Sequence, residues 1–320
     1  ITGTIMIKFF KDNIILIFVL SCILAVSTQA DGNEIYINQS GANVEVTIVQ
    51  DGQNNRISTK STAASPATAY GKNQTYTFTQ TGDNNKIGLY KHYYGSDNQT
   101  SSTMTAVQTG DNNTMYLDNH GDNNNFDAYQ SHNNAVMDLE IDYDGNSVIA
   151  KQACSATSCN RDSMVLNVYQ GNDNNIKMGQ GYKIGTNGSF SYDNTEIGGH
   201  SMDLYVTGDR NDIMLSQRSS NSYSGHDMDV NVYSDDNDIH VIQEHNSSKD
   251  LTLTLNNDDN NVDIDQKKNF QHTATITLSG SYGTDLNLQQ GSNNSTSALT
   301  YSLTQNCQTV GGCSISVTQN

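Results

Sequence analysis

The chain has 320 residues and a formal net charge of −18, but only 34% of its residues are hydrophobic, Pro occurs once and Trp is absent. An ordinary enzyme of this length builds a compact core from more apolar residues, so the composition argues against one. Either the chain is disordered or its core is thin and repetitive. The strict alternation described below favours the thin, repetitive core.

The amino end has the features of a processing segment. Residues 1–5 are interpreted as read from upstream of a start at Met6. Residues 6–30 are predicted to be a secretory signal peptide, because two lysines precede a short apolar run that ends in the small-x-small site Thr28-Gln29-Ala30. We therefore expect an exported protein whose single repeat domain covers residues 31–320.

The charge balance bears on the partners of the exported domain. Removal of residues 1–30 takes away two Lys and one Asp and leaves 14 basic and 33 acidic residues, a formal charge of −19. No basic patch remains to neutralise phosphate groups, so nucleic acid is not expected as a partner.

Four cysteines follow the leader, in two close pairs: Cys154 with Cys159, and Cys307 with Cys313. In an exported protein such pairs are predicted to be local disulfides that close loop tips. A shared metal site is the weaker alternative, because the two pairs lie about 150 residues apart. No cofactor is expected.

A repeated unit fills almost all of the chain after the leader. Each unit has an arm of the form apolar-x-apolar-x-Gln, a turn of about five residues rich in Gly, Asp and Asn, and a second alternating arm. The stretch Gln-Thr-Gly-Asp-Asn-Asn occurs unchanged at 80–85 and at 108–113. Two-residue alternation is typical of half-buried strands, and no segment after the leader keeps a helical period.

The Gln of each arm is in phase with the apolar residues and is therefore predicted to point inward. An isolated buried amide is costly. Amides stacked one rung above another, about 4.8 Å apart, can instead hydrogen-bond to each other in a ladder. The predicted ladder consists of Gln39, Gln50, Gln80, Gln108, Gln130, Gln152, Gln170, Gln180, Gln217, Gln243, Gln266, Gln290, Gln305 and Gln319.

The turns are predicted to use residues that tolerate left-handed backbone angles. These turn residues are Gly41, Asn43, Gly82, Asn84, Gly110, Asn112, Gly121 and Asn123.

Counting the arms gives about 22, hence about 11 strand–turn–strand rungs, and predicts an all-β solenoid. Some turns grow into long loops. If the arms strictly alternate between two edges, the loops before about residue 146 lie on one edge and those after Gln152 on the other. These loops are 61–73, 91–102, 153–163, 181–201, 218–227 and 244–250.

The spacing Gln-x-Gly-x-Asn, followed by a second Gln ten or eleven residues on, resembles the curlin repeat of bacterial curli fibres. The resemblance covers roughly residues 34–320. It implies a flat two-sheet β-solenoid that is exported by dedicated outer-membrane machinery, started by a nucleator and stacked end to end on itself into extracellular amyloid of the biofilm matrix. The matching positions are Gln39/Gly41/Asn43/Gln50, Gln80/Gly82/Asn84, Gln108/Gly110/Asn112 and Gln170/Asn174/Gln180.

Two other functions remain open. A monomeric or surface-attached binding module would present loop aromatics to glycans or surfaces; the candidates are Tyr93, Tyr94, Tyr182, Phe190, Tyr192 and Tyr223. Divalent cations such as Ca²⁺ would relieve the repulsion between carboxylates stacked at corresponding turns; the candidates are Asp173, Asp209, Asp236 and Asp258.

An enzyme is not expected. The eight His are scattered, and the sequence shows neither a nucleophile–base pairing nor a phosphate-binding loop. The paired carboxylates fall in turns, where Asp serves backbone hydrogen bonding.

Overall fold

The computed structural model describes 21 stretches of the chain, and every structural statement below concerns these residues. They are 3–7, 32–39, 44–59, 67–69, 73–89, 101–118, 121–141, 144–153, 163–168, 174–185, 187–192, 201–207, 212–218, 226–233, 237–244, 249–256, 260–267, 272–279, 284–291, 299–306 and 313–319.

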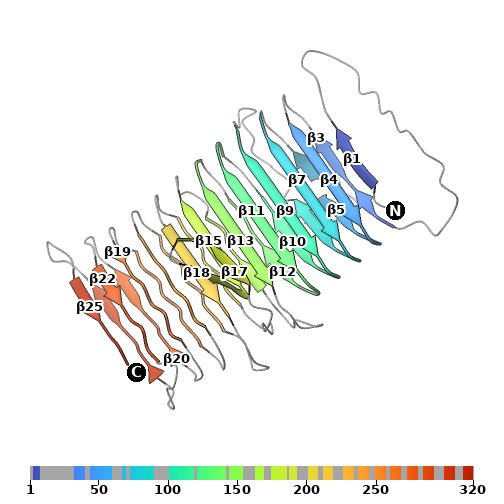
Figure 1. Ribbon diagram of the computed structural model, residues 1–320. Helices are drawn as coiled ribbons and strands as arrows, with labels where there is room; N and C mark the ends of the chain where they lie inside the picture. Colours follow the sequence, from blue (N-terminus) through green and yellow to red (C-terminus); the bar gives the residue numbers. More distant parts are fainter. Residues whose placement is uncertain are drawn as a thin grey trace, which may run out of the picture.

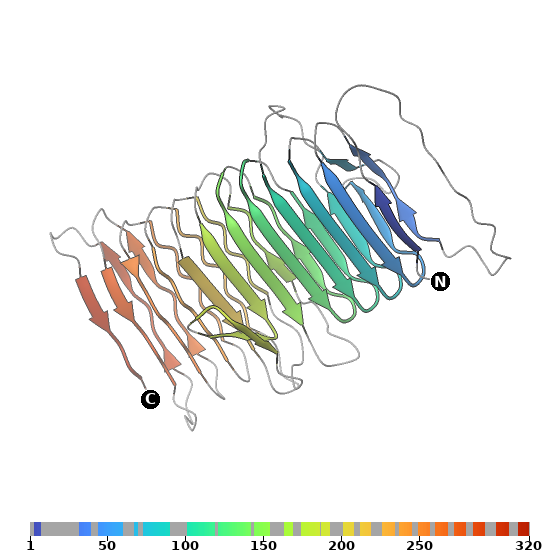
Figure 2. The same cartoon turned by 45° about the horizontal axis from the view of Figure 1, so that its top comes forward.

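Parallel strands stack along one axis and build an elongated two-sheet solenoid (Figures 1 and 2). The described stretches contain no helix. The predicted all-β solenoid is therefore confirmed.

The first sheet, sheet A, has eight strands. The pairing between its first two strands is antiparallel, and every other pairing is parallel. They are β1 (Gly3–Ile7), β4 (Glu45–Asp51), β7 (Thr75–Thr81), β9 (Thr103–Thr109), β11 (Asn125–Ser131), β13 (Ser147–Ala153), β15 (Asn175–Gln180) and β18 (Asp212–Gln217). Single bridges Asp212–Asp238 and Asp238–Asn261 extend this sheet to β19 (Asn260–Asn261), β22 (Thr284–Asn287) and β25 (Cys313–Ser316).

The opposite sheet, sheet B, has six parallel strands. They are β2 (Glu34–Ile35), β5 (Arg56–Thr59), β8 (Lys86–Leu89), β10 (Thr114–Leu117), β12 (Val136–Asp138) and β14 (Ser163–Val165). Backbone hydrogen bonds continue it through residues 201–206, 226–233 and 249–255 to β20 (His272–Thr273), β21 (Thr277–Ser279), β23 (Leu299–Thr300) and β24 (Thr304–Asn306).

Two short pairs lie outside these sheets. Strand β3 (Ile37–Gln39) pairs in parallel with β6 (Ala67–Ala69). Strands β16 (Tyr182–Ile184) and β17 (Phe190–Tyr192) form an antiparallel hairpin within a segment that the sequence predicts as a loop.

One rung consists of a sheet A strand, a turn and a sheet B strand, after which the chain returns to sheet A. The long segments 60–73 and 90–101 connect sheet B to sheet A, whereas 154–162 and 181–201 connect sheet A to sheet B. The predicted division of the loops between the two edges is therefore confirmed.

Alternating side chains fill the space between the sheets with a single buried cluster. In β7 and β9 every second residue is buried and the residues between them are partly exposed. Because neighbouring strands are in register, like residues form columns: Met115 pairs with Met137 in sheet B, and Ala128 pairs with Ala150 in sheet A. The core is thus two residues deep and repeats along the axis.

Strand β1 comes from the segment predicted to be read-through and leader. It pairs antiparallel with β4, with Gly3 opposite Gln50. The first edge of sheet A is therefore covered by residues that lie before the predicted mature start at Asp31.

Candidate functional site

The inward Gln residues of sheet A form a hydrogen-bonded column. Gln50 donates from Nε2 to Gln80 Oε1 at 2.8 Å, and Gln80 donates in turn to Gln108 at 2.9 Å. The same link joins Gln108 to Gln130 at 2.9 Å, Gln130 to Gln152 at 3.0 Å, Gln152 to Gln180 at 2.8 Å and Gln180 to Gln217 at 3.4 Å.

Five amide nitrogens of this column also use their second hydrogen: those of Gln80, Gln108, Gln130, Gln152 and Gln180. Gln108 Nε2 donates to the backbone carbonyl of Lys86 in sheet B at 3.0 Å, and Gln130 Nε2 does the same to Thr114 at 3.0 Å. The column therefore ties the two sheets together across the core as well as each rung to the next. A buried amide is tolerated here because both donors and the oxygen are paired.

Three predicted ladder members do not join this column in the described residues. The backbone of Gln39 pairs with Ala69 outside sheet A, and that of Gln305 pairs with Leu278 in sheet B. Gln170 lies outside the described residues, and Gln152 bonds directly to Gln180. The column is confined to the arms of sheet A, because only these arms carry Gln at the same height in successive rungs.

The direction in which the amides of the column donate their hydrogen bonds reverses after Gln217. Beyond that point Gln266 Nε2 donates back to Gln243 Oε1 at 2.6 Å, Gln290 donates back to Gln266 at 2.7 Å, and Gln319 donates back to Gln290. Gln217 Nε2 is buried and has no hydrogen-bond partner among the described residues.

The Gly–Asp–Asn turn is held by the neighbouring rung. Gly82 has a φ of 106°, and a Cβ there would overlap the carbonyl oxygen of Gly110 in the next rung. Asn84 has a φ of 58°. The carboxylate of Asp111 accepts the backbone N–H of Asp83 at 2.8 Å. The turn therefore needs Gly for close approach and an acceptor at the Asp position.

The other predicted turn residues divide into described and undescribed positions. Gly110 and Gly121 have φ values of 103° and 100°, and Asn112 and Asn123 have values of 59° and 58°, which repeat the geometry of Gly82 and Asn84. Gly41 and Asn43 lie outside the described residues.

The last Asn of the turn forms a second ladder, which the sequence analysis missed. Asn55 Oδ1 accepts the backbone N–H of Asn85 at 3.0 Å, and Asn113 Oδ1 accepts that of Ala135 at 2.9 Å. Asn85 also donates from Nδ2 to the carbonyl of Gly110 at 2.6 Å. The signal for this ladder in the sequence is the Asn that directly precedes the sheet B strands β5, β8 and β10.

A similar row of amides lines the opposite edge. Asn124 Oδ1 accepts the backbone N–H of Asn146 at 2.7 Å, and Asn174 Nδ2 donates to Asn146 Oδ1 at 2.8 Å. Further along, Asn237 donates to Asn260 at 2.9 Å. Both edges of the solenoid are thus closed by stacked amides.

Ionisable side chains replace the Asn ladder in the later rungs. His226, Lys249 and His272 are buried at the start of successive sheet B segments, and Lys249 and His272 pair in register. Burial lowers the pKa of Lys249 from 10.5 to about 7. His226 Nε2 lies 2.7 Å from the backbone carbonyl of Glu244.

The outer face of sheet A carries an aromatic cluster under the β16–β17 hairpin. Lys151 Nζ lies 4.9 Å from the ring centroids of both Tyr129 and Phe190. Tyr182 packs edge-on against Phe190, with centroids 6.0 Å apart, and Tyr192 is 41% exposed. Of the predicted loop aromatics, Tyr93, Tyr94 and Tyr223 lie outside the described residues.

Two described carboxylates on the outer face of sheet A are paired with amides of the next rung. Asn261 donates to Asp238 at 3.0 Å, and Asn287 donates to Asp263 at 3.2 Å. No group of His, Cys, Asp and Glu suited to a metal ion occurs within the described stretches. The predicted cation candidates lie outside them: Asp173, Asp209, Asp236 and Asp258.

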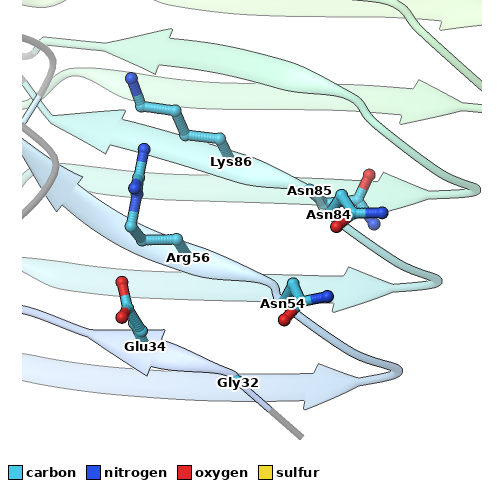
Figure 3. A pocket seen from close by; sticks show the side chains of 7 residues that line it. All are labelled: Gly32, Glu34, Asn54, Arg56, Asn84, Asn85 and Lys86. Carbon is cyan, nitrogen blue, oxygen red and sulfur yellow. The ribbon is translucent and has the colours of Figure 1, made fainter.

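A shallow hollow of about 270 Å³ lies on sheet B near the first rungs. Glu34, Arg56 and Lys86 stand in one column on successive strands, and Asn54 and Asn84 lie at the turns beside them (Figure 3). The seven lining residues offer charges and amides but no nucleophile–base pair.

The apolar columns become more exposed at the two ends of the described stack. Ile35 in β2 is 36% exposed, whereas Ile57 beside it in β5 is 0% exposed. At the other end Ile315 and Val317 are only partly buried, whereas Leu286 opposite Ile315 is 1% exposed. Both ends therefore present core side chains, and the open strand edges are β2 at the first end and β25 at the last, while β1 covers β4.

The two predicted disulfides involve side chains that the structure does not describe. Cys154, Cys159 and Cys307, and the side chain of Cys313, lie outside the described residues, so the two disulfides stay predictions. Within the described stretches no helix is long and apolar enough to cross a membrane.

Comparison of the chain with family models, with curated proteins and with solved structures finds no match in any of the three.

Proposed function

We propose that the protein is a secreted, non-catalytic structural subunit that assembles end to end with itself into extracellular amyloid-like fibres. The observation that carries this proposal is the unfinished core at both ends of the stack. Ile35 at one end and Val317 at the other continue columns that are fully buried in the interior rungs. Buried apolar area stabilises association, and unpaired strand edges template further strands.

The order of strands at the two ends favours head-to-tail addition. Without β1, which precedes the predicted mature start, the described stack begins with a sheet B strand, β2, and ends with a sheet A strand, β25. A second copy in the same orientation would place its β4 beside β25 and its β2 beside β23. The parallel register of every rung interface would then continue across the junction.

The outward residues at the C-terminal end also suit a junction between two acidic chains. Ser314, Ser316 and Thr318 in the last sheet A arm and Thr300 and Ser302 in the last sheet B arm are uncharged. Like charges placed directly opposite each other on neighbouring strands destabilise a sheet. A neutral end can therefore approach the first rung, which carries Glu and Asp, without that repulsion.

The proposal is tested with a chain that begins at Asp31. We expect fibres in electron micrographs, binding of thioflavin-type dyes and a reflection near 4.7–4.8 Å. Val317→Asp places a charge in the core column and should slow elongation at least tenfold, whereas the matched change Thr318→Asp, on the exposed side of the same arm, should not. Chains that begin at Asp31, carry no substitution and remain monomeric at high concentration would contradict the proposal.

The resemblance to curlin repeats extends the proposal to location and partners. In that setting the fibre belongs to the biofilm matrix at the bacterial cell surface, and the subunit depends on outer-membrane export machinery and a nucleator. Whether this chain is the main subunit or the nucleator is decided by seeding: a nucleator accelerates assembly of a different subunit when it is present at a small molar fraction.

A binding module is the second candidate function, and the Tyr129–Lys151–Phe190 cluster favours it. Aromatic faces beside a cation can stack on sugar rings, and Tyr192 is exposed at this position. Glycan-array binding that is lost in Tyr192→Ala and kept in Tyr233→Ala, a change at another exposed Tyr, would support this function.

A further inference from the structure

The Gln column contains two ladders of opposite sense that meet at Gln217. From Gln50 to Gln180 every amide nitrogen of the column donates to the next Gln toward the C-terminal end, and the last acceptor is Gln217. From Gln319 to Gln243 every donation runs toward the N-terminal end. A change of sense inside one column leaves a mismatch where the two ladders meet, and that mismatch is the buried, unpartnered Nε2 of Gln217.

The second hydrogen of each amide distinguishes the geometry of the two ladders. In the first ladder the two donations diverge: Gln108 Nε2 bonds backward to the Lys86 carbonyl and forward to Gln130. In the second ladder both donations point backward: Gln290 Nε2 bonds to the Thr273 carbonyl at 2.7 Å and to Gln266 at 2.7 Å. Reversing the second ladder breaks these carbonyl bonds, and they re-form only if each amide adopts the diverging geometry of the first ladder, in which a forward-donating nitrogen also reaches the preceding carbonyl.

The two senses also determine what the ends of the column present. Gln50 directs its nitrogen inward to Gln80, and Gln319 directs its nitrogen inward to Gln290. Each end therefore presents an amide oxygen. If two copies meet head to tail, two acceptors face each other with no proton between them, and buried unpaired acceptors are costly.

We propose that docking of a second copy reverses the C-terminal ladder as a unit, so that the interface and the defect at Gln217 are satisfied together. After reversal Gln319 donates to Gln50 of the added copy, and Gln217 donates to Gln243. The intermediate links then run in the sense of the first ladder, from Gln243 to Gln266, from Gln266 to Gln290 and from Gln290 to Gln319.

The reversal needs a rotation of each terminal amide, which exchanges oxygen and nitrogen within the same volume, together with a readjustment that returns the nitrogen to the preceding carbonyl as in the first ladder. A single rotated amide would create one oxygen–oxygen and one nitrogen–nitrogen contact, so the members must turn together. The ladder is therefore a two-state element that couples the fibre end to a site four rungs away. This inference rests on the proposed end-to-end assembly.

The experiment reads the Gln217 side-chain amide by ¹⁵N NMR in the monomer and in the fibre, with the signal assigned by its loss in Gln217→Met. We expect its proton signal to move downfield and its exchange with water to slow on assembly. Gln217 lies far from the interface, so a direct contact with the added copy cannot produce this change.

Two matched variants test the route. Gln266→Met interrupts the ladder between the interface and Gln217 and should abolish the shift at Gln217 in fibres. Gln108→Met makes the same change on the other side of Gln217 and should leave the shift intact. Fibres in which the Gln217 signal equals that of the monomer would overturn the ladder reversal and leave the assembly proposal standing. A chain that forms no fibres would overturn both.

Discussion

Asn85 Oδ1 accepts the backbone N–H of Asn113 at 3.0 Å, although the two residues are 28 positions apart in the chain. The side-chain oxygen of each Asn in this ladder accepts the backbone N–H of the equivalent residue in the next rung. Its own backbone N–H donates to the side-chain oxygen of the Asn one rung earlier. The turn is therefore stabilised by its neighbours, and an isolated unit lacks these bonds. This explains why the Gly–Asp–Asn turns recur with so little change in the first rungs.

Asn85→Ala should lower the free energy of unfolding by about 1–3 kcal/mol, because the buried N–H of Asn113 loses its acceptor. Denaturant unfolding of the monomer measures this difference. The matched control is Asn54→Gly, since Asn54 is exposed and its φ of 57° suits Gly. Equal effects of the two changes would show that the ladder contributes nothing.

Gln108→Leu should keep the burial of the side chain but cost about 1–3 kcal/mol, because Gln80 Nε2 loses its acceptor and the link to Gln130 is lost. We also expect slower elongation, since one of the polar contacts that set the register between rungs is then lost. Thermal unfolding and elongation kinetics measure the two effects.

Gln39→Leu is the matched control for Gln108→Leu. The sequence assigns Gln39 to the same ladder, but its backbone pairs with Ala69, outside sheet A. This change should therefore leave both stability and elongation close to those of the unaltered chain. A loss as large as that of Gln108→Leu would place Gln39 in a ladder after all.

The sequence predicts the rungs well and the ladders only in part. Two-residue alternation places Gln inward in both kinds of arm, but it does not tell which arms share a sheet. The alternation therefore assigns Gln80 and Gln108 to one ladder with Gln39 and Gln305, although only the first two lie on strands of sheet A. Which arm pairs with which depends on rung height, and that emerges only when the whole stack is assembled.

The Asn ladder and the reversal at Gln217 were missed for different physical reasons. In the turn Asp83-Asn84-Asn85, turn propensity accounts for all three residues, so the inward role of Asn85 adds no separate signal. The sense of an amide ladder is not encoded locally at all, because Gln has a donor and an acceptor at the same end. Only the whole chain of partners determines it.

Lys249→Met should stabilise the later rungs below pH 7. Lys249 is fully buried, and burial lowers its pKa from 10.5 in the unfolded chain to about 7 in the fold. Below pH 7 both states carry the charge and the fold bears the full cost, whereas above pH 10.5 both states are neutral and the cost vanishes. Stability of the unaltered chain should therefore rise between pH 7 and pH 10.5 through this group.

The effect is large enough to measure. One pKa unit corresponds to about 1.4 kcal/mol, so the full pH-dependent difference is of the order of 5 kcal/mol. Urea unfolding at a series of pH values should show a slope that Lys249→Met removes, whereas Lys183→Met, at a Lys whose side chain is 45% exposed, should retain it. An unchanged slope in Lys249→Met would mean that Lys249 keeps an ordinary pKa.

Removal of the amino-terminal segment should allow another copy of the chain to add at the β4 end. In the full chain β1 pairs antiparallel with β4 from Gly3 opposite Gln50 to Ile7 opposite Val46, and it occupies the edge at which β25 of another copy would dock. A chain that begins at Asp31 leaves that edge open. Because elongation requires one open edge of each kind, the shorter chain should elongate fibres from seeds at least ten times faster than the full chain at equal concentration.

Thr4→Pro in the full chain is the matched test of the β1–β4 pairing itself, because Pro removes a backbone donor and is poorly tolerated within a paired strand. This variant should elongate at a rate between those of the full and the shortened chain, although it keeps all residues. If the full chain and the chain from Asp31 elongate equally fast, β1 does not protect the edge, and the first rung must be kept from premature assembly in another way.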